Sequence, residues 1–73
     1  MGKAKTVQVV SSDNLDRTLV VEIDGVRYEY WFHGEVPLTT VHKILRYSPG
    51  RCIQYLRKNS YKAVKLVDGV QKV

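Results

Sequence analysis

Basic side chains gather in the second half of this chain, where acidic side chains are almost absent. Residues 36–73 hold eight Lys or Arg and one acid, Asp68, whereas residues 1–35 hold four Lys or Arg and six Asp or Glu. The net charge of +5 is therefore the sum of +7 and −2. Such asymmetry favours a polyanion as ligand. The alternative is a solvated cationic surface that keeps a small protein in solution.

Six cations of this half are the candidate phosphate contacts. They are Lys43, Arg46, Arg51, Arg57, Lys58 and Lys62. Because Lys and Arg neutralise phosphates whatever the base sequence, we expect weak, sequence-tolerant and salt-sensitive binding. Trp31 is the candidate stacking residue, since an aromatic ring can stack on an unpaired base.

The segment Ser48-Pro49-Gly50-Arg51 combines a helix start with a guanidinium. Ser48 is predicted as the N-cap and Pro49 as the first helical residue, where its missing N–H costs nothing. Free backbone N–H groups, the positive end of the helix dipole and Arg51 together suit a phosphate oxygen. The alternative is a plain helix cap with a solvated Arg.

Side chains that could catalyse a reaction are few and scattered. His33, His42 and Cys52 show no metal-ligand spacing and fall on three different predicted elements. Cys52 lies on an apolar stripe, so we expect it to be buried and inert. No glycine-rich phosphate loop occurs. The sequence therefore predicts no enzyme activity, no metal and no cofactor.

A small sheet must position the candidate contacts, and its centre is predicted as a hairpin over residues 18–32. Two β-rich runs flank Asp24-Gly25, the pair that a two-residue type I′ turn requires. This turn pairs Ile23 with Val26. Alternation then places on one face the apolar side chains Leu19, Val21, Ile23, Val26, Tyr28, Tyr30 and Phe32.

The same alternation decides which aromatic rings a ligand can reach. Tyr28 and Tyr30 share the apolar face, so we expect them in the core with their hydroxyls at the rim. Trp31 lies on the opposite face. There it can anchor a ligand or a partner protein. It can equally be covered by the N-terminal strand or the C-terminal tail, and the sequence leaves the two open.

Two short helices are predicted after the hairpin, over residues 38–47 and 49–59. Pro37 fits at or just before the start of the first helix. Apolar residues recur at helical spacing in the first helix at Leu38, Val41 and Ile44 or Leu45, and in the second at Cys52, Ile53 and Leu56.

The two ends of the chain are predicted to add strands to the hairpin. Residues 6–10 form a candidate edge strand and residues 11–14 a polar turn cluster. Residues 63–67 form a candidate last strand, which Asp68-Gly69 could turn into a weak terminal hairpin, and residues 1–5 are expected to be frayed. The helix pair is the only apolar element left to cover the sheet, so residues 1–73 are predicted as one two-layer α+β domain.

Length and cysteine content set further bounds. At 73 residues, a hydrophobic core is near its marginal size. The single cysteine excludes an internal disulfide. No signal peptide and no apolar run of membrane-spanning length is visible, so we expect a cytoplasmic protein without a membrane partner.

Several short motifs follow one another between about Ser11 and Asn59. They are Leu19-x-Val21-x-Ile23-x-Gly25, Tyr28-Glu29-Tyr30, Val36-Pro37, Val41, Leu45 and Ser48-x-Gly50-Arg51. In this order they resemble the KTSC domain, found at the C-terminus of some lysyl-tRNA synthetases and as a stand-alone bacterial or phage protein. The resemblance implies RNA as ligand, since RNA binding has been proposed for that family. The chain departs from the family pattern at residues 31–35, which lengthen the second strand or its loop, and at His42 and Cys52-Ile53, which replace aromatics.

We therefore expect a small non-enzymatic nucleic-acid-binding module, for RNA rather than duplex DNA. The alternative is a protein-interaction module, such as a phage-type accessory or inhibitor protein, that docks on an acidic partner through Trp31, Tyr47 and Tyr55 with flanking Arg. A third hypothesis is homodimerisation through an unpaired edge strand of the sheet.

Overall fold

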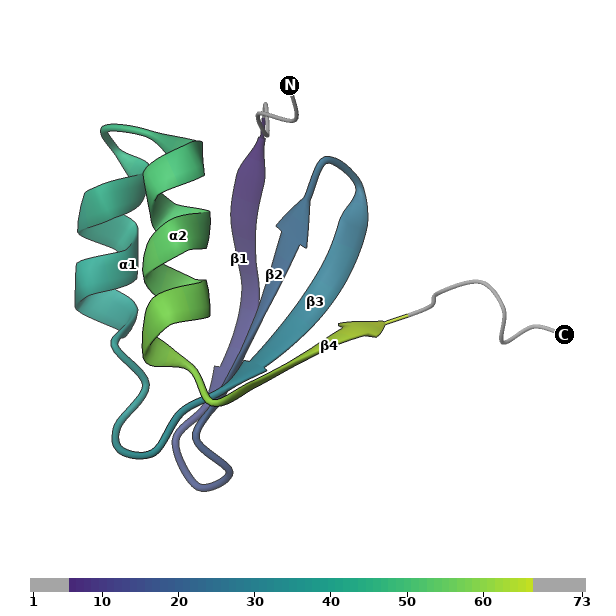
Figure 1. Ribbon diagram of the computed structural model, residues 1–73, viewed down its shortest axis with the longest axis vertical. Coiled ribbons are helices and arrows are strands. Elements are labelled where there is room, and N and C mark those ends of the chain that lie inside the picture. The colour runs from purple at the N-terminus through teal and green to yellow at the C-terminus, as the bar shows by residue number, and fades with distance from the viewer. Residues whose placement is uncertain (1–5, 67–73) are drawn as a thin grey trace, which may run out of the picture.

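In the part of the chain that the computed structural model describes, four antiparallel strands form one sheet and two helices cover one of its faces (Figure 1). The structure describes residues 6–66. The strands follow each other in the sheet in chain order, and the helices lie between the third and fourth strands in the sequence. The elements are β1 (Val7–Asp13), β2 (Thr18–Ile23), β3 (Val26–Trp31), α1 (Leu38–Leu45), α2 (Pro49–Asn59) and β4 (Lys62–Leu66). The predicted two-layer α+β class is confirmed.

β2 and β3 form the predicted hairpin in the predicted register. Asp24 and Gly25 have φ of 50° and 88°, the positive values that a type I′ turn needs at both positions. Ile23 pairs with Val26 across the turn. The apolar face of this hairpin is therefore turned toward the helices, as predicted.

β1 is longer than the sequence predicted. Residues 11–13 continue the strand instead of forming a turn, because they pair with β2. The register shifts between Val9 and Ser11, so Val10 is the extra residue of a β-bulge and is 41% exposed. The turn follows Asp13, whose carboxylate accepts the N–H of Leu15 at 2.9 Å. The polar cluster thus marks the end of the strand and does not replace it.

The other end of β1 is anchored on the hairpin turn. The Thr6 backbone N–H donates to the Asp24 carboxylate at 3.0 Å, and the Asp24 N–H donates to the Thr6 carbonyl at 3.0 Å. Asp24 therefore holds two elements at once, a role beyond that of a turn residue.

α1 ends at Leu45, two residues earlier than predicted. The N–H of Arg46 donates to the Lys43 carbonyl at 3.3 Å and the N–H of Tyr47 to the Ile44 carbonyl at 2.9 Å. This i→i+3 pattern tightens the final turn, and the chain leaves the helix early as a result.

The starts of both helices agree with the predictions. Pro37 is the residue before α1, where its φ of −79° and ψ of 58° make an inverse γ-turn. Ser48 caps α2, since its hydroxyl accepts the N–H of Arg51 at 3.3 Å. Pro49 is the first residue of α2.

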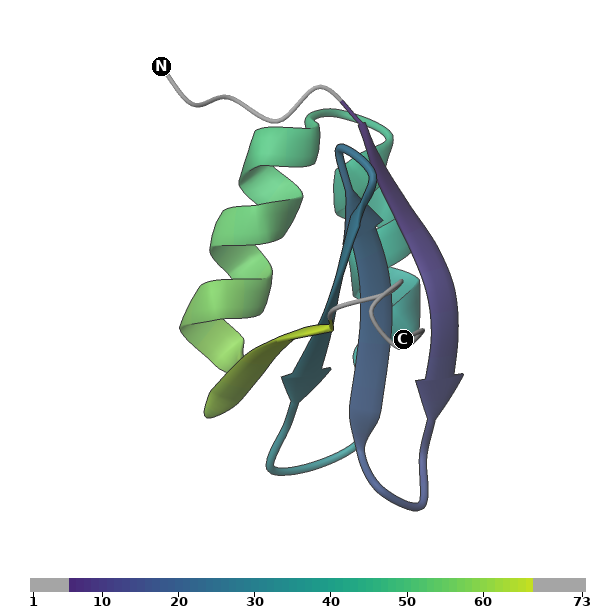
Figure 2. The same cartoon turned by 90° about the vertical axis from the view of Figure 1, so that its right-hand side faces the viewer.

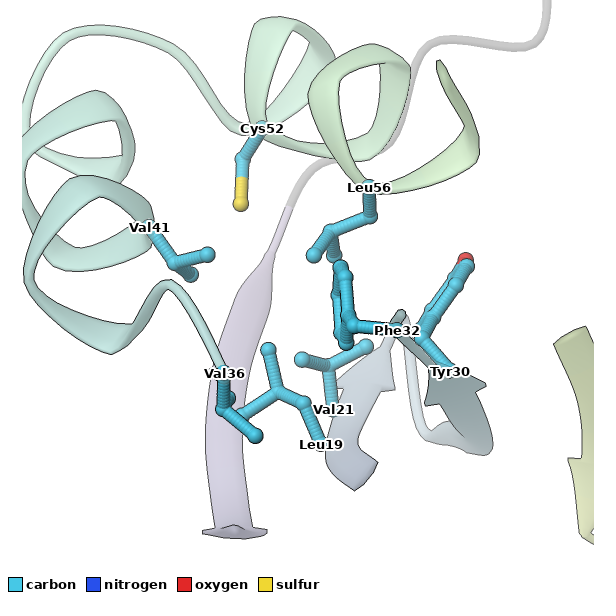
Figure 3. Packing of buried hydrophobic residues seen from close by; sticks show 8 residues of the cluster. All are labelled: Leu19, Val21, Tyr30, Phe32, Val36, Val41, Cys52 and Leu56. Atoms are coloured by element: carbon cyan, nitrogen blue, oxygen red, sulfur yellow. The ribbon is translucent and has the colours of Figure 1, made fainter. Parts of the chain in front are cut away.

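The core fills the space between the helix pair and the sheet (Figure 3). Tyr30 is 3% exposed and Tyr28 is half-buried, which confirms the face predicted for both. Cys52 is fully buried, also as predicted. The buried apolar side chains are Leu19, Val21, Tyr30, Phe32, Val36, Val41, Cys52 and Leu56. Each large one stabilises the fold by about 1.5–3 kcal/mol.

β4 pairs with β3 and forms an edge of the sheet opposite β1. It begins at Lys62, one residue earlier than predicted, and the predicted last residue, 67, lies outside the described residues. Figure 2 shows it beside β3, with the helices on the far side of the sheet. No side chain of β4 is fully buried. The predictions for residues 1–5 and for a hairpin at Asp68-Gly69 lie outside the described residues.

Candidate nucleic-acid interface

Four of the six predicted phosphate contacts lie on the helix pair, on the side turned away from the sheet. The inward positions of the helices are taken by Val41 on α1 and by Cys52 and Leu56 on α2. The outward positions carry exposed cations at or next to these helices, Lys43, Arg46, Arg51 and Lys58. We call this side the outer helical surface and define it by those four residues.

The first groove on this surface runs between the end of α1 and α2. It has a volume of about 340 Å³ and is open to solvent. Ile44 and Tyr55 are half-buried in it, and Tyr47 is 79% exposed at its rim. The polar lining consists of Arg51, Gln54 and Lys58. This groove thus combines an apolar floor, an exposed ring, an amide and two cations.

The second groove lies on α1. It has a volume of about 430 Å³ and is lined by Thr39, His42, Lys43 and Arg46. Because all four side chains are exposed and polar, this groove is suited to a solvated anion rather than to an apolar group.

Arg57 stands apart from the four residues of the outer helical surface. It is exposed near the Tyr30 phenol, at the junction of α2 with the sheet. Burial raises the pKa of Tyr30, and the Arg57 charge acts in the opposite direction by favouring the phenolate. Arg57 can therefore extend the outer helical surface only at its border with the sheet.

Lys62 and Trp31 lie on the opposite face of the sheet. They pair across the β3–β4 ladder, and the Lys62 Nζ is 5.2 Å from the centroid of the Trp31 ring. Trp31 is half-buried, and its Nε1 is buried without a hydrogen-bond partner within residues 6–66. The structure therefore does not join Lys62 and Trp31 to the outer helical surface.

The acidic residues in the described part of the chain lie on its strands and loops. Residues 36–66 contain seven Lys or Arg and no Asp or Glu. On the open face of the sheet both signs occur, and Glu22 and Arg27 form an ion pair at 3.5 Å. The helices thus form a cationic layer over a sheet of mixed charge.

The start of α2 offers fewer free donors than the sequence suggested. Pro49 has no N–H, and the N–H of Arg51 is already bonded to the Ser48 hydroxyl. The N–H of Cys52 donates to the Ser48 carbonyl at 3.2 Å. Only the Gly50 N–H of this first turn remains, so a phosphate here would depend on the Arg51 guanidinium.

The candidate catalytic side chains are not brought together. His33 stacks on Tyr61 with ring centroids 4.5 Å apart, His42 lines the groove on α1, and Cys52 is in the core. Burial raises the pKa of the Cys52 thiol above its usual range. Within residues 6–66 no three His, Cys, Asp or Glu side chains are placed to share a metal ion.

Of three residues that line the first groove, the sequence predicted two as contacts and missed one. Tyr47 and Tyr55 were predicted as contacts for a protein partner, and Gln54 was not singled out. Its signal is the spacing Arg51, Gln54, Lys58, which places three polar side chains on one side of α2.

Comparison of this chain with protein-family models, curated proteins and solved structures finds no match. Neither described helix has the length and apolar character needed to cross a bilayer.

Proposed function

We propose that this protein binds nucleic acid through the outer helical surface, with Lys43, Arg46, Arg51 and Lys58 as phosphate contacts. The observation that carries the proposal is the separation of charge. Five cations and no acid lie on or at the end of the helices, whereas the acids among residues 6–66 lie on the strands and loops. A surface of one sign beside a mixed face attracts and orients a polyanion.

This proposal changes the contact set expected from the sequence. Lys62 and Trp31 are left out because they lie on the other face of the sheet. Arg57 is kept as a phosphate contact at the border between the outer helical surface and the sheet.

RNA or another single strand is the preferred ligand over duplex DNA. α1 has eight residues and α2 eleven, and both pack against the sheet through Val41, Cys52 and Leu56. The shortness of both helices argues against a recognition helix in the major groove. The resemblance of residues 11–59 to the KTSC domain also supports RNA. A cytoplasmic setting, which keeps thiols reduced, suits the unpaired Cys52.

The test is fluorescence anisotropy with short single-stranded RNA, hairpin RNA and duplex DNA, each across a salt series. We expect the double variant Arg51→Ala, Lys58→Ala to weaken binding and to flatten the log–log salt slope by about 1.4, that is ~0.7 for each single-strand phosphate. The matched control is Lys62→Ala, Lys65→Ala, which removes the same charge from two exposed positions of β4.

Two results would overturn the proposal. One is the absence of binding to all three nucleic acids at low salt. The other is an equal loss in the control variant, which would assign the binding to net charge and not to the outer helical surface.

An acidic protein is the second candidate partner. The observation that favours it is Tyr47, 79% exposed beside Arg51, since Tyr and Arg are enriched among interface hot spots. Trp31, predicted in the same set, faces the other side of the sheet. This candidate predicts no nucleic-acid binding at low salt. For the protein partner, it predicts loss of binding in Tyr47→Ala but little change in Lys43→Ala.

A further inference from the structure

We infer that the groove between α1 and α2 holds one unpaired nucleobase, with Tyr47 stacked on it and the neighbouring phosphates on Arg51 and Lys58. This inference rests on the proposed function and deepens it. It makes the ligand a single strand with an accessible base, where the cationic surface by itself would accept any polyanion.

The two cations are spaced along one side of α2. Arg51 and Lys58 are seven residues apart, which is two helical turns and about 10.5 Å along the axis. Both line the groove. A strand that follows α2 can therefore contact one cation on each side of the apolar floor.

The floor and rim of the groove suit a flat, partly apolar group. Ile44 and Tyr55 are half-buried and leave apolar surface open to the groove. The Tyr47 ring at the rim is 79% exposed, so it has a face free for stacking. Base–aromatic stacking tolerates any base, because every base has a π-face.

Size and polarity agree with this occupant. The volume of about 340 Å³ is near the lower end of the range for small-ligand sites, ~300–1,000 Å³. Gln54 lies between Arg51 and Lys58 on α2 and presents an amide with both donor and acceptor groups. Such an amide can bind the edge of a base, which is hidden in a paired stem.

The experiment compares three fluorescently labelled ligands of equal length: a single-stranded RNA, the same backbone without bases, and a fully paired stem. We expect Tyr47→Ala to weaken binding of the single strand by roughly tenfold and to leave its salt slope unchanged, because stacking involves no counterion release. Binding of the abasic strand should not change in this variant. Tyr47→Phe should bind the single strand with the same affinity as the wild-type protein.

The control variant is Tyr61→Ala. Tyr61 is also an exposed tyrosine, at 54%, but it stacks on His33 and does not line the groove. Circular dichroism of each variant checks that the fold is retained.

The experiment distinguishes a failure of this inference from a failure of the proposed function. One result would overturn the base site and keep the proposed function. In it, all three ligands bind with equal affinity, Tyr47→Ala has no effect, and the double variant Arg51→Ala, Lys58→Ala weakens binding. No binding to any ligand overturns both. Displacement of the single strand by equimolar adenosine monophosphate would overturn the assignment of the groove to a strand.

Discussion

The ammonium nitrogen of Lys62 lies 5.2 Å from the centre of the Trp31 ring, across the ladder that joins β3 to β4. Both side chains are on the sheet face that the helices leave uncovered. This distance is that of a cation–π contact between neighbouring strands. The pair therefore contributes to holding β4 on the sheet, and it is remote from the outer helical surface.

Lys62→Ala should lower the free energy of unfolding by about 0.5–1 kcal/mol, the strength of an exposed cation–π contact. Urea denaturation measures this, with Lys65→Ala as the matched change on the other face of β4. We also expect Lys62→Ala to affect RNA binding less than Arg51→Ala does. An unchanged stability, or an equal loss of binding, would contradict this role.

Ser48→Ala should lower the free energy of unfolding by about 1 kcal/mol, because the N–H of Arg51 then loses its partner at the start of α2. Ser48→Asp keeps an acceptor at this position and adds a charge that the helix dipole favours, so it should restore most of the stability. Thermal denaturation followed by circular dichroism would show both. Equal stability of Ser48→Ala and the unchanged chain would rule out the cap as a stabilising contact.

Gly25→Ala should cost about 1 kcal/mol through backbone conformation. The φ of Gly25 is 88°, and a Cβ at this position would meet nothing within 4 Å. Gly34 offers the matched control, because a Cβ there also meets nothing within 4 Å and its φ is not positive. We expect Gly34→Ala to be close to neutral in the same urea titration. Similar costs for the two variants would argue against the type I′ turn.

Leu56→Ala should remove a large part of the stability. Leu56 is fully buried, and such substitutions cost about 2–5 kcal/mol, a substantial share of the ~5–15 kcal/mol that a small domain has. Leu15, which is 92% exposed, provides the control, and Leu15→Ala should stay within about 0.5 kcal/mol. The comparison is made by urea denaturation. A loss from Leu15→Ala as large as that from Leu56→Ala would contradict the assignment of the core.

The Cys52 thiol should react slowly with a thiol reagent in the folded protein and fast after denaturation. Because burial raises the pKa of Cys52 above the usual 9.0, the folded protein holds this proton more tightly than the unfolded chain does. The contribution of this thiol to the free energy of unfolding is therefore fully present below pH 9.0. It is lost as the pH rises from 9.0 through the higher pKa of the folded state.

The free energy of unfolding of the unchanged protein should therefore fall above pH 9.0. Cys52→Ala should lack this part of the pH dependence, and below pH 9.0 it should be less stable than the wild-type protein because it leaves a small cavity. Rapid labelling of the folded protein at neutral pH would contradict the buried position of the thiol.

Local patterns account for most of the fold. The hairpin register followed from Asp24-Gly25 and strict alternation, since a slip of one residue would have turned Tyr30 and its neighbours out of the core. The start of α2 followed from Ser48 and Pro49, whose preferences belong to that position. Such features depend on residues close in sequence.

The parts that depended on distant pairing were less predictable. Residues 11–13 have the composition of a turn, but pairing with β2 overrides that preference. The separation of Lys62 from the other candidate contacts needed the register of β4 against β3, which no short pattern supplies. The groove of Ile44, Tyr47 and Tyr55 likewise required the packing of two helices.

β4 contributes a hydrogen-bond ladder and the Lys62–Trp31 contact but no fully buried side chain. Its opening would therefore leave the core of the other elements closed, and would cost much less than global unfolding. Amide hydrogens of β3 that face β4 should exchange by this local opening, and those that face β2 only when the whole domain unfolds. While β4 is open, the edge of β3 is a template on which a strand of another molecule can add. Assembly through this sheet would then be under kinetic control, with a rate set by how often β4 leaves.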